Sequence, residues 1–194
     1  LGYGCDPHDE SLLNELTRVR VGRTGRLPEM LAKLAELGMP LTEAEIAEQV
    51  GSSPSLGRPH VADAMVAKGY VADRQQAFDE YLFDGGPAYA NRYSCDIRRG
   101  IELIRRAKGV PVIAHPWGRG RQRELTPAVL SELAMEYRLE GVEVDHPDHD
   151  AETRARLRPL AQQLGLLQLG SSDHHGLGKV AHELACETTP EEVY

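Results

Sequence analysis

The amino-acid sequence predicts an α/β fold in which a helical first half precedes a half that alternates helix and strand. Residues 9–89 show helical spacing of apolar side chains without a convincing strand, whereas residues 95–172 contain three short apolar, strand-like runs. Polar residues cluster directly after each of the three runs. Alternating helices and strands are typical of a parallel sheet or barrel, in which the ends of such strands share one edge.

The first half contains a series of predicted helices. Leu12 and Leu16 begin the first helix, and the segments 27–38, 42–51, 60–71 and 74–82 give the others. Thr42 followed by Glu45 forms a capping box, in which two side chains satisfy backbone N–H groups at the helix start. The turn at 84–89 ends this stretch, and no repeat of 20–50 residues is present.

The second half contains helices and strands in alternation. Thr126 with Pro127 is a typical helix start, and Asp150 can cap the next helix. We expect the helices over 97–107, 126–137 and 150–164, and the strands over 110–114, 141–144 and 166–169.

The charge balance limits the class of partner. The 194 residues carry 22 basic and 30 acidic side chains, which gives a formal net charge of −8. A general binder of duplex DNA needs a positive surface that displaces counterions, so the composition argues against one. It leaves room for a small phosphorylated substrate held at a local site.

Cysteine usage and hydropathy predict a reduced, cytoplasmic protein without a membrane partner. Cys5, Cys95 and Cys186 are far apart and form no C-x-x-C pair. No run of about 18 apolar residues occurs, and no signal peptide is recognisable. Because the first residue is Leu1 rather than Met, the sequence looks like a piece of a longer protein.

Side chains after the first and last strands predict a metal site. His115 follows one strand, and Asp173 and His175 follow the other at a spacing that puts both on one side of an extended segment. An aspartate and imidazoles held together suit zinc, manganese or iron. The alternatives are a polar loop at 171–176 and a capping or hydrogen-bonding role for His115.

The segment after the middle strand has two interpretations. Glu143 and Asp145 lie two residues apart, and His146 and His149 follow them. They could ligate the metal or support its ligands at the same edge of the sheet. The alternative is a solvated loop that caps the helix beginning at Asp150.

Two other segments could contact the substrate. Arg58 offers a planar fork of donors that matches a phosphate, and His60 could add a donor, although both could simply begin a helix with Pro59. Trp117, in a loop with Arg119, Arg121 and Arg123, could stack on a base if it is exposed. A packed tryptophan in a basic loop is the alternative.

Together these segments resemble the PHP family of metal-dependent phosphoesterases, in particular its nucleoside-bisphosphate phosphatases and short-RNA exonucleases. The matching pieces are LGYG, GRPH, GGPAY, VIAHPWG, GVEVDHPDH and GSSDHHG, in the family's order. The resemblance implies that residues 1–8 and 90–194 are the C-terminal part of a distorted (β/α)7 barrel, with an all-helical insertion domain at 9–89. It also implies two or three divalent ions (Mn, Fe or Zn) in the complete protein.

The resemblance also implies roles for individual residues. His115, Asp173 and His175 would be metal ligands and catalytic residues, while Arg58 and His60 would contact the substrate phosphate. His146 would be a further site residue, and Trp117 and Arg119 complete the predicted substrate-binding set. The implied activity is hydrolysis of a nucleotide or short RNA phosphate ester by metal-activated water.

The sequence departs from the family at its start. The H-x-H strand, the D-H-D turn and the bridging glutamate with which the family opens do not occur in it. Part of the metal site would then lie outside this chain, so the chain alone is expected to be inactive.

Three other functions compete with this interpretation. Residues 42–82 could form a winged-helix or helix-turn-helix DNA-binding module, but they contain seven acidic residues against three basic ones. A truncated, non-catalytic domain that binds a partner is the second alternative. The third is a metal-dependent amidohydrolase, since such barrels also place histidine and aspartate at strand ends.

Overall fold

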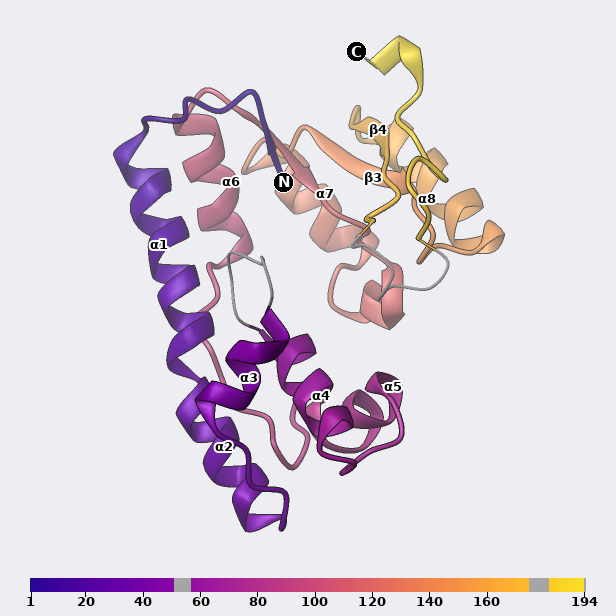
Figure 1. Ribbon diagram of the computed structural model, residues 1–194. Helices are drawn as coiled ribbons and strands as arrows, with labels where there is room; N and C mark the ends of the chain where they lie inside the picture. The colour runs from indigo at the N-terminus through magenta and orange to yellow at the C-terminus, as the bar shows by residue number, and fades with distance from the viewer. Residues whose placement is uncertain (51–56, 175–181, 194) are drawn as a thin grey trace. The chain divides into compact units, whose positions relative to one another are not determined.

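The computed structural model describes residues 1–50, 57–174 and 182–193, which belong to two compact units (Figure 1). One unit comprises Leu1–Leu12 with Asp96–Tyr194, and the other comprises Leu13–Cys95. The predicted mixed α/β fold is confirmed, because the described residues form a four-stranded sheet and eight α-helices. No helix in these residues is long and apolar enough to cross a membrane.

The unit Leu13–Cys95 is helical, as its sequence predicts. Thr42 and Glu45 form the expected capping box, with the Thr42 N–H 2.8 Å from the Glu45 carboxylate. Its core includes Leu34, Ile46 and Met65, all fully buried. Its helices are α1 (Glu10–Gly25, beginning in the other unit), α2 (Leu27–Glu36), α3 (Glu43–Val50), α4 (Arg58–Ala67), α5 (Arg74–Ala77) and a π-helix, η1 (Phe78–Leu82).

No strand occurs in residues 13–50 and 57–95, the described part of this unit. A winged helix needs a β-hairpin beside its helices, so the described residues do not support a winged-helix module.

The other unit contains the sheet, with strands in the order β1-β2-β3-β4. The two-residue β1 (Gly2–Tyr3) pairs antiparallel with β2 (Val110–Ile113). Strands β2, β3 (Gly141–Asp145) and β4 (Leu167–Gly170) are parallel neighbours. The carboxyl ends of these three strands therefore lie side by side at one edge of the sheet.

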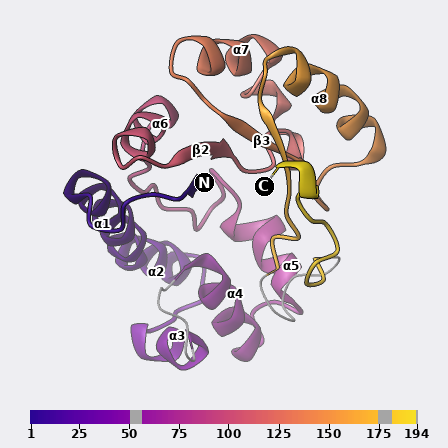
Figure 2. The same cartoon turned by 90° about the horizontal axis from the view of Figure 1, so that it is seen from above.

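Three helices cover one face of this sheet: α6 (Ile97–Arg106), α7 (Pro127–Met135) and α8 (Ala151–Gln163) (Figure 2). Asp96, Thr126 and Asp150 cap them. Ile113, Val142 and Val144 point from the strands into the core beneath the helices. The alternate strand residues Val110, Val112, Leu167 and Leu169 face the other side, where they line a cavity of about 510 Å³.

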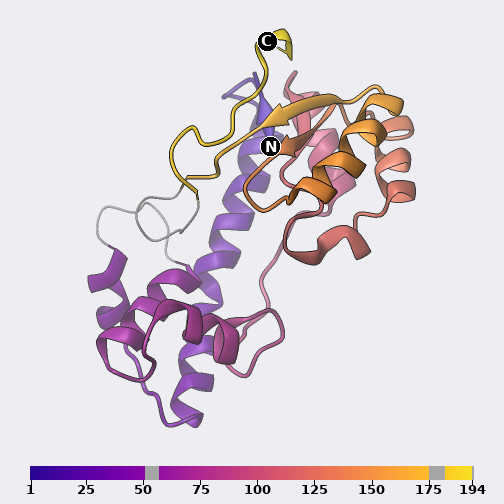
Figure 3. The ribbon, with the colours of Figure 1, turned by 90° about the vertical axis from the view of Figure 1, so that its right-hand side faces the viewer.

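The C-terminal segment runs along β4 (Figure 3) and ends in the short 3-10 helix η3 (Glu191–Val193). The Thr189 hydroxyl donates to the Gly170 carbonyl at 3.1 Å. A Cβ at Gly170 would lie 2.1 Å from the Thr188 carbonyl oxygen, so this close approach requires glycine.

Candidate metal centre

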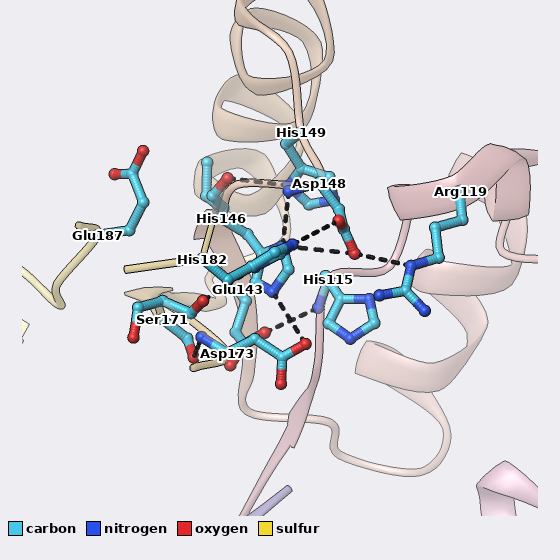
Figure 4. Close-up of polar contacts among 12 residues, drawn as sticks. His115, Arg119, Glu143, His146, Asp148, His149, Ser171, Asp173, His182 and Glu187 are labelled. Carbon is cyan, nitrogen blue, oxygen red and sulfur yellow. Dashed lines mark hydrogen bonds and ion pairs between the residues drawn. The ribbon is translucent and has the colours of Figure 1, made fainter. Parts of the chain in front are cut away.

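Three side chains from three strand ends converge in the sheet-containing unit (Figure 4). His115 lies two residues after β2, His146 directly follows β3, and Asp173 lies three residues after β4. One potential ligand atom from each residue lies within 4.8 Å of those of the other two. We call these three residues the strand-end cluster.

The backbone at two members of the cluster is strained. His115 has φ 29° and Asp173 has φ 46°, values in the left-handed region that non-glycine residues rarely adopt. Such conformations cost about 1–3 kcal/mol each and are concentrated at functional sites. The Glu143 carboxylate holds the turn after β2 by accepting from the His115 N–H at 3.0 Å.

Two ring nitrogens of the cluster are buried without a hydrogen-bond partner in the described residues: Nδ1 of His115 and Nε2 of His146. Buried polar atoms normally find partners, because leaving one unpaired costs about 1–3 kcal/mol. The His146 ring is fully buried, and its Nε2 lies 3.8 Å from the nearer Asp173 oxygen. Each of these nitrogens can therefore interact with a further group bound at the cluster, either as a hydrogen-bond donor or as a metal ligand.

The two histidines offer different chemistry. The backbone N–H of Asp148 donates to Nδ1 of His146 at 3.0 Å, so in a neutral His146 ring the proton is on Nε2. Nε2 is then a hydrogen-bond donor and has no lone pair for a metal. Among the residues that the structure describes, none forms a hydrogen bond that fixes the tautomer of His115 in this way, so its Nδ1 can ligate.

Burial sets the protonation of the cluster. It lowers the pKa of His146 to about 4, and the neighbouring His115 charge adds to this shift. It also lowers the pKa of His115, with opposing contributions from Asp173 and Asp148 and smaller lowering contributions from Arg119 and Arg121. Both rings are thus neutral near pH 7. Burial raises the pKa of Glu143, whereas the hydrogen bond from the His115 N–H lowers it and so opposes this shift.

Asp148 connects the cluster to two other segments. One carboxylate oxygen lies 3.0 Å from Nε of Arg119, and the other lies 3.2 Å from Nε2 of His182. The His182 ring is also anchored by its Nδ1, which donates to the Ser172 carbonyl at 3.0 Å. These contacts tie the loop after β2, the turn after β3 and the C-terminal segment together around His146.

Arg154 of α8 holds the turn after β3 from the opposite side. Its guanidinium donates to the carbonyl of His146 at 2.9 Å and to that of His149 at 3.0 Å, and it pairs with Glu187 at 2.5 Å. The position of His146 therefore depends on α8 as well as on β3.

The structure brings some of the predicted site residues together. His115, His146 and Asp173 meet in the cluster, and Arg119 lies beside it through Asp148. His175 lies outside the described residues. The expected extended segment at Asp173 is wrong, because its φ of 46° turns the chain there. The exposed His174 contacts the His182 carbonyl instead of the cluster.

Trp117 does not fit the role of an exposed stacking platform. Its side chain is 5% exposed, and its indole N–H donates to the Leu125 carbonyl at 2.7 Å. The packed alternative describes this residue correctly. Burial of the large apolar indole ring next to a strand end is favourable. This gain outweighs contacts that the ring could make with the exposed arginines of the loop.

Arg58 and His60 lie at the start of α4, in the helical unit. The Arg58 guanidinium contacts Asp84 at 2.5 Å and the Leu82 carbonyl at 2.8 Å. Nδ1 of His60 accepts from the Gly57 N–H at 3.0 Å, which closes the first turn of the helix. The helix-start interpretation thus holds for both residues.

Asp148 and His182 were not singled out by their sequence pattern. The residue pattern DHPDHD at 145–150 contains Asp148 but gives no reason to prefer it over its acidic neighbours. His182 lies in a segment without periodicity, so only the folded chain shows its contact with Asp148.

Comparisons with known proteins give both sequence relatives and similar solved structures. No family model matches the sequence. The chain is 29% identical over 154 residues to the phosphoribosyl 1,2-cyclic phosphate 1,2-diphosphodiesterase of Eggerthella lenta, which covers 78% of this chain and 56% of that protein. It is 28% identical over 178 residues to the 5'-3' exoribonuclease of Haemophilus influenzae, covering 90% and 63%.

Two solved structures are also similar. A metal-dependent phosphoesterase from Bifidobacterium adolescentis matches with a TM-score of 0.84 and 30% identity, covering 97% of this chain and 66% of that one. An amidohydrolase from Chromobacterium violaceum, with bound sulfate and no metal, matches with a TM-score of 0.71 and 26% identity, covering 86% and 58%. The chain thus spans between half and two thirds of the length of these relatives.

Proposed function

Because the chain is homologous to the metal-dependent phosphoesterases of the PHP family, we propose that it is part of an enzyme that hydrolyses phosphate esters of nucleotides or short oligonucleotides. The observation that carries the proposal is the convergence of His115, His146 and Asp173 within 4.8 Å. The relatives are named as enzymes that cleave cyclic phosphates or RNA.

The strand-end cluster fits a divalent cation. His115 offers a buried nitrogen without a partner among the described residues, and Asp173 offers carboxylate oxygens. Imidazole with carboxylate suits manganese, iron or zinc, and we propose two or three such ions in the complete protein. A bound divalent ion lowers the pKa of a water molecule toward neutrality and neutralises phosphoryl oxygens. Both residues have the left-handed backbone that is concentrated at functional sites.

His146 has a different role in this proposal. Its Nε2–H points into the cluster and can donate to Asp173, to a substrate oxygen or to the leaving group. Burial keeps the ring neutral, so one proton remains on Nε2 at neutral pH. His146 is thus a hydrogen-bond donor beside the metal rather than a ligand.

Arg58 and His60 remain our proposal for the substrate phosphate. The Asp84 side chain that pairs with Arg58 is 70% exposed, and exposed ion pairs contribute about 1 kcal/mol or less. A phosphate, which accepts two parallel hydrogen bonds from Arg58, can therefore replace Asp84. Nδ1 of His60 accepts a backbone N–H, which leaves Nε2–H as a donor for an anion.

For the complete protein we propose a distorted (β/α)7 barrel that residues 1–8 and 90–194 help to form, with an insertion domain at 9–89. Support comes from the sheet face that lies away from α7 and α8, where Val110, Val112 and Leu169 line an apolar cavity. In a closed barrel this face points inward and is filled by side chains. We expect this chain alone to be inactive or weakly active.

The deciding experiment combines metal analysis with substrate preference. The chain is loaded with manganese, iron or zinc, desalted, and assayed on a nucleoside 3',5'-bisphosphate, a 5'-phosphorylated RNA trinucleotide and an N-acetylated amino acid. Bound metal supports the metal centre. Release of inorganic phosphate from the bisphosphate, or of a mononucleotide from the trinucleotide, supports the phosphoesterase. The same assay is run on the longer protein where this chain alone shows no turnover.

Amide hydrolysis is the second candidate, because one similar structure is named an amidohydrolase. Turnover of the N-acetylated amino acid without hydrolysis of the bisphosphate or the trinucleotide would favour it. A chain that retains no metal after loading would instead favour a non-catalytic domain.

A further inference from the structure

The loop after β2 carries positive charge that the proposed chemistry at the cluster does not use. It contains the 3-10 segment η2 (Gly118–Arg123), which begins three residues after His115 and includes Arg119, Arg121 and Arg123. All three arginines are exposed. This charge lies beside the cluster in a protein with a net charge of −8.

The loop has a defined conformation. The buried Trp117 directly precedes the loop and fixes its N-terminal end. The Trp117 indole N–H donates to the carbonyl of Leu125, which follows the C-terminal end of the loop. The N–H groups of Glu124 and Leu125 both donate to the Arg121 carbonyl at 2.9 Å. These contacts fix the backbone from which Arg121 and Arg123 project.

The loop also packs directly against the cluster. The Gly118 N–H donates to the His115 carbonyl at 3.1 Å, and a Cβ at Gly118 would lie 3.0 Å from Cβ of Asp148 and 3.4 Å from Nδ1 of His115. A larger residue at this position would crowd Asp148, so glycine favours this close approach. Arg119 completes the contact with its ion pair to Asp148, shown in Figure 4.

The three arginines differ in their contacts. Arg119 is occupied by Asp148 and serves to hold the loop. The side chains of Arg121 and Arg123 make no hydrogen bond or ion pair with the residues that the structure describes. Arg121 lies near enough to His115 for its charge to act on that ring. Two exposed guanidinium groups of the loop, of which that of Arg121 is near His115, are thus available to an anion.

We propose that Arg121 and Arg123 form a second phosphate subsite, which binds a phosphodiester of a single-stranded oligoribonucleotide whose scissile phosphate lies at the strand-end cluster. This inference rests on the proposed function and narrows its substrate class. A nucleoside monophosphate with its phosphate at the cluster has no charge left for these arginines, whereas an oligonucleotide, like a nucleoside bisphosphate, has a further phosphate for them.

The subsite recognises charge rather than bases. Arginine–phosphate contacts position a nucleic acid without reading its sequence, and the ring that could have stacked on a base, Trp117, is buried. The subsite therefore distinguishes substrates by the number of phosphates and not by base identity.

The test is a binding measurement without turnover. In the presence of a chelator, a fluorescein-labelled, 5'-phosphorylated adenylate trinucleotide is titrated with the wild-type chain and with the R121Q/R123Q variant, and AMP is measured as a competitor. We expect the double variant to bind the trinucleotide about tenfold more weakly and AMP equally well. The slope of log Kd against log salt concentration should decrease by about 0.7 for each phosphate contact removed.

The matched control is R105Q/R106Q. It removes the same two charges from exposed arginines at the end of α6, where the chain enters the amino end of β2, at the opposite edge of the sheet from His115. This variant should behave as the wild type does. Circular dichroism confirms that each variant is folded.

The outcomes separate this inference from the proposed function. Equal trinucleotide affinity in wild type and R121Q/R123Q, equal losses in both double variants, or no trinucleotide binding by the wild type would each overturn the subsite. A selective loss in R121Q/R123Q supports it even where the metal-loaded protein hydrolyses no phosphate ester, a result that would count against the proposed function alone.

Discussion

His146 and His115 lie side by side, with ring centroids 4.5 Å apart, yet their hydrogen bonds assign them different roles. We expect His115→Ala and Asp173→Asn to weaken metal binding by more than about a hundredfold, since each removes a ligand. His146→Ala should weaken it less, by about 10- to 100-fold, the range seen for residues that hydrogen-bond to metal ligands. Titration of the metal-free chain with manganese or zinc, followed by calorimetry, measures all three.

The informative comparison is between His146→Ala and His146→Gln. The glutamine amide can still donate a hydrogen bond, so in a catalytically competent form of the protein it should recover part of the turnover that alanine loses. A loss of metal affinity in His146→Ala as large as that in His115→Ala would make His146 a ligand and contradict the tautomer argument.

The pKa of His146 also predicts a pH dependence of stability. Its folded-state value of about 4 lies below the ordinary value of 6.5, so the native state excludes the proton that the unfolded chain accepts. The contribution of His146 to the free energy of unfolding is fully present above pH 6.5 and is lost as the pH falls from 6.5 to 4. At about 1.4 kcal/mol for each pKa unit, the loss amounts to about 3 kcal/mol. Urea unfolding between pH 7.5 and 4.5 measures this slope.

A variant isolates the contribution of this one histidine. In His146→Gln the slope between pH 6.5 and 4.5 should be shallower, whereas substitution of the exposed His8 by glutamine should leave it as in the wild type. An unchanged slope in His146→Gln would assign the acid sensitivity to other groups.

At this scale, sequence reasoning finds residue types better than their contacts. His115 and Asp173 could be singled out because each follows an apolar, strand-like run. The tautomer of His146 could not, because it depends on the position of the Asp148 N–H in the folded turn. Trp117 was ambiguous for the same reason, since burial of a ring is decided by the chain that packs over it.

At the scale of elements, the turn after β3 depends on a single side chain of α8. Arg154→Met removes charged donors from two carbonyls of that turn, those of His146 and His149. Leaving such acceptors unpaired costs about 1–3 kcal/mol, so we expect a loss of stability in that range and a weaker metal site. Thermal and urea unfolding, together with metal titration, test this.

Arg158 provides the matched control one turn further along α8. It pairs with Asp145 at 2.6 Å, but its side chain is 45% exposed and donates to no carbonyl of the turn. Arg158→Met should therefore cost about 1 kcal/mol or less. Equal effects of the two substitutions would show that Arg154 acts through its charge alone.

The elements themselves follow largely from local chemistry. Thr42, Thr126 and Asp150 cap helices as their sequence context predicts, and the three parallel strands form where apolar runs occur. The two-residue β1 was not predicted, because it forms only by pairing with β2. The chain turns at Asp173 instead of continuing as the predicted extended segment, because a left-handed aspartate has no signature in the sequence.

At the scale of the whole molecule, the described residues form one hydrophobic core in each of the two units. The core of the helical unit is built from residues between Leu27 and Ala90, and that of the sheet-containing unit from residues between Ile97 and Leu166. All three residues of the strand-end cluster belong to the sheet-containing unit. Metal binding should therefore require only the sheet-containing unit, whereas the proposed phosphate contacts of Arg58 and His60 require the helical one.

A deletion tests this division. In a variant in which a flexible glycine–serine linker replaces Leu13–Cys95, we expect the affinity for manganese or zinc to stay within about threefold of the wild type, because no cluster residue or its core is removed. In a catalytically competent form of the protein, the same deletion should raise KM for a phosphate ester strongly, and Arg58→Ala in the intact chain should reproduce much of that rise. A folded deletion variant that has lost its metal would show that the helical unit supplies part of the metal site. An unchanged KM in both variants would remove Arg58 from substrate binding and leave the anion contacts to Arg121 and Arg123.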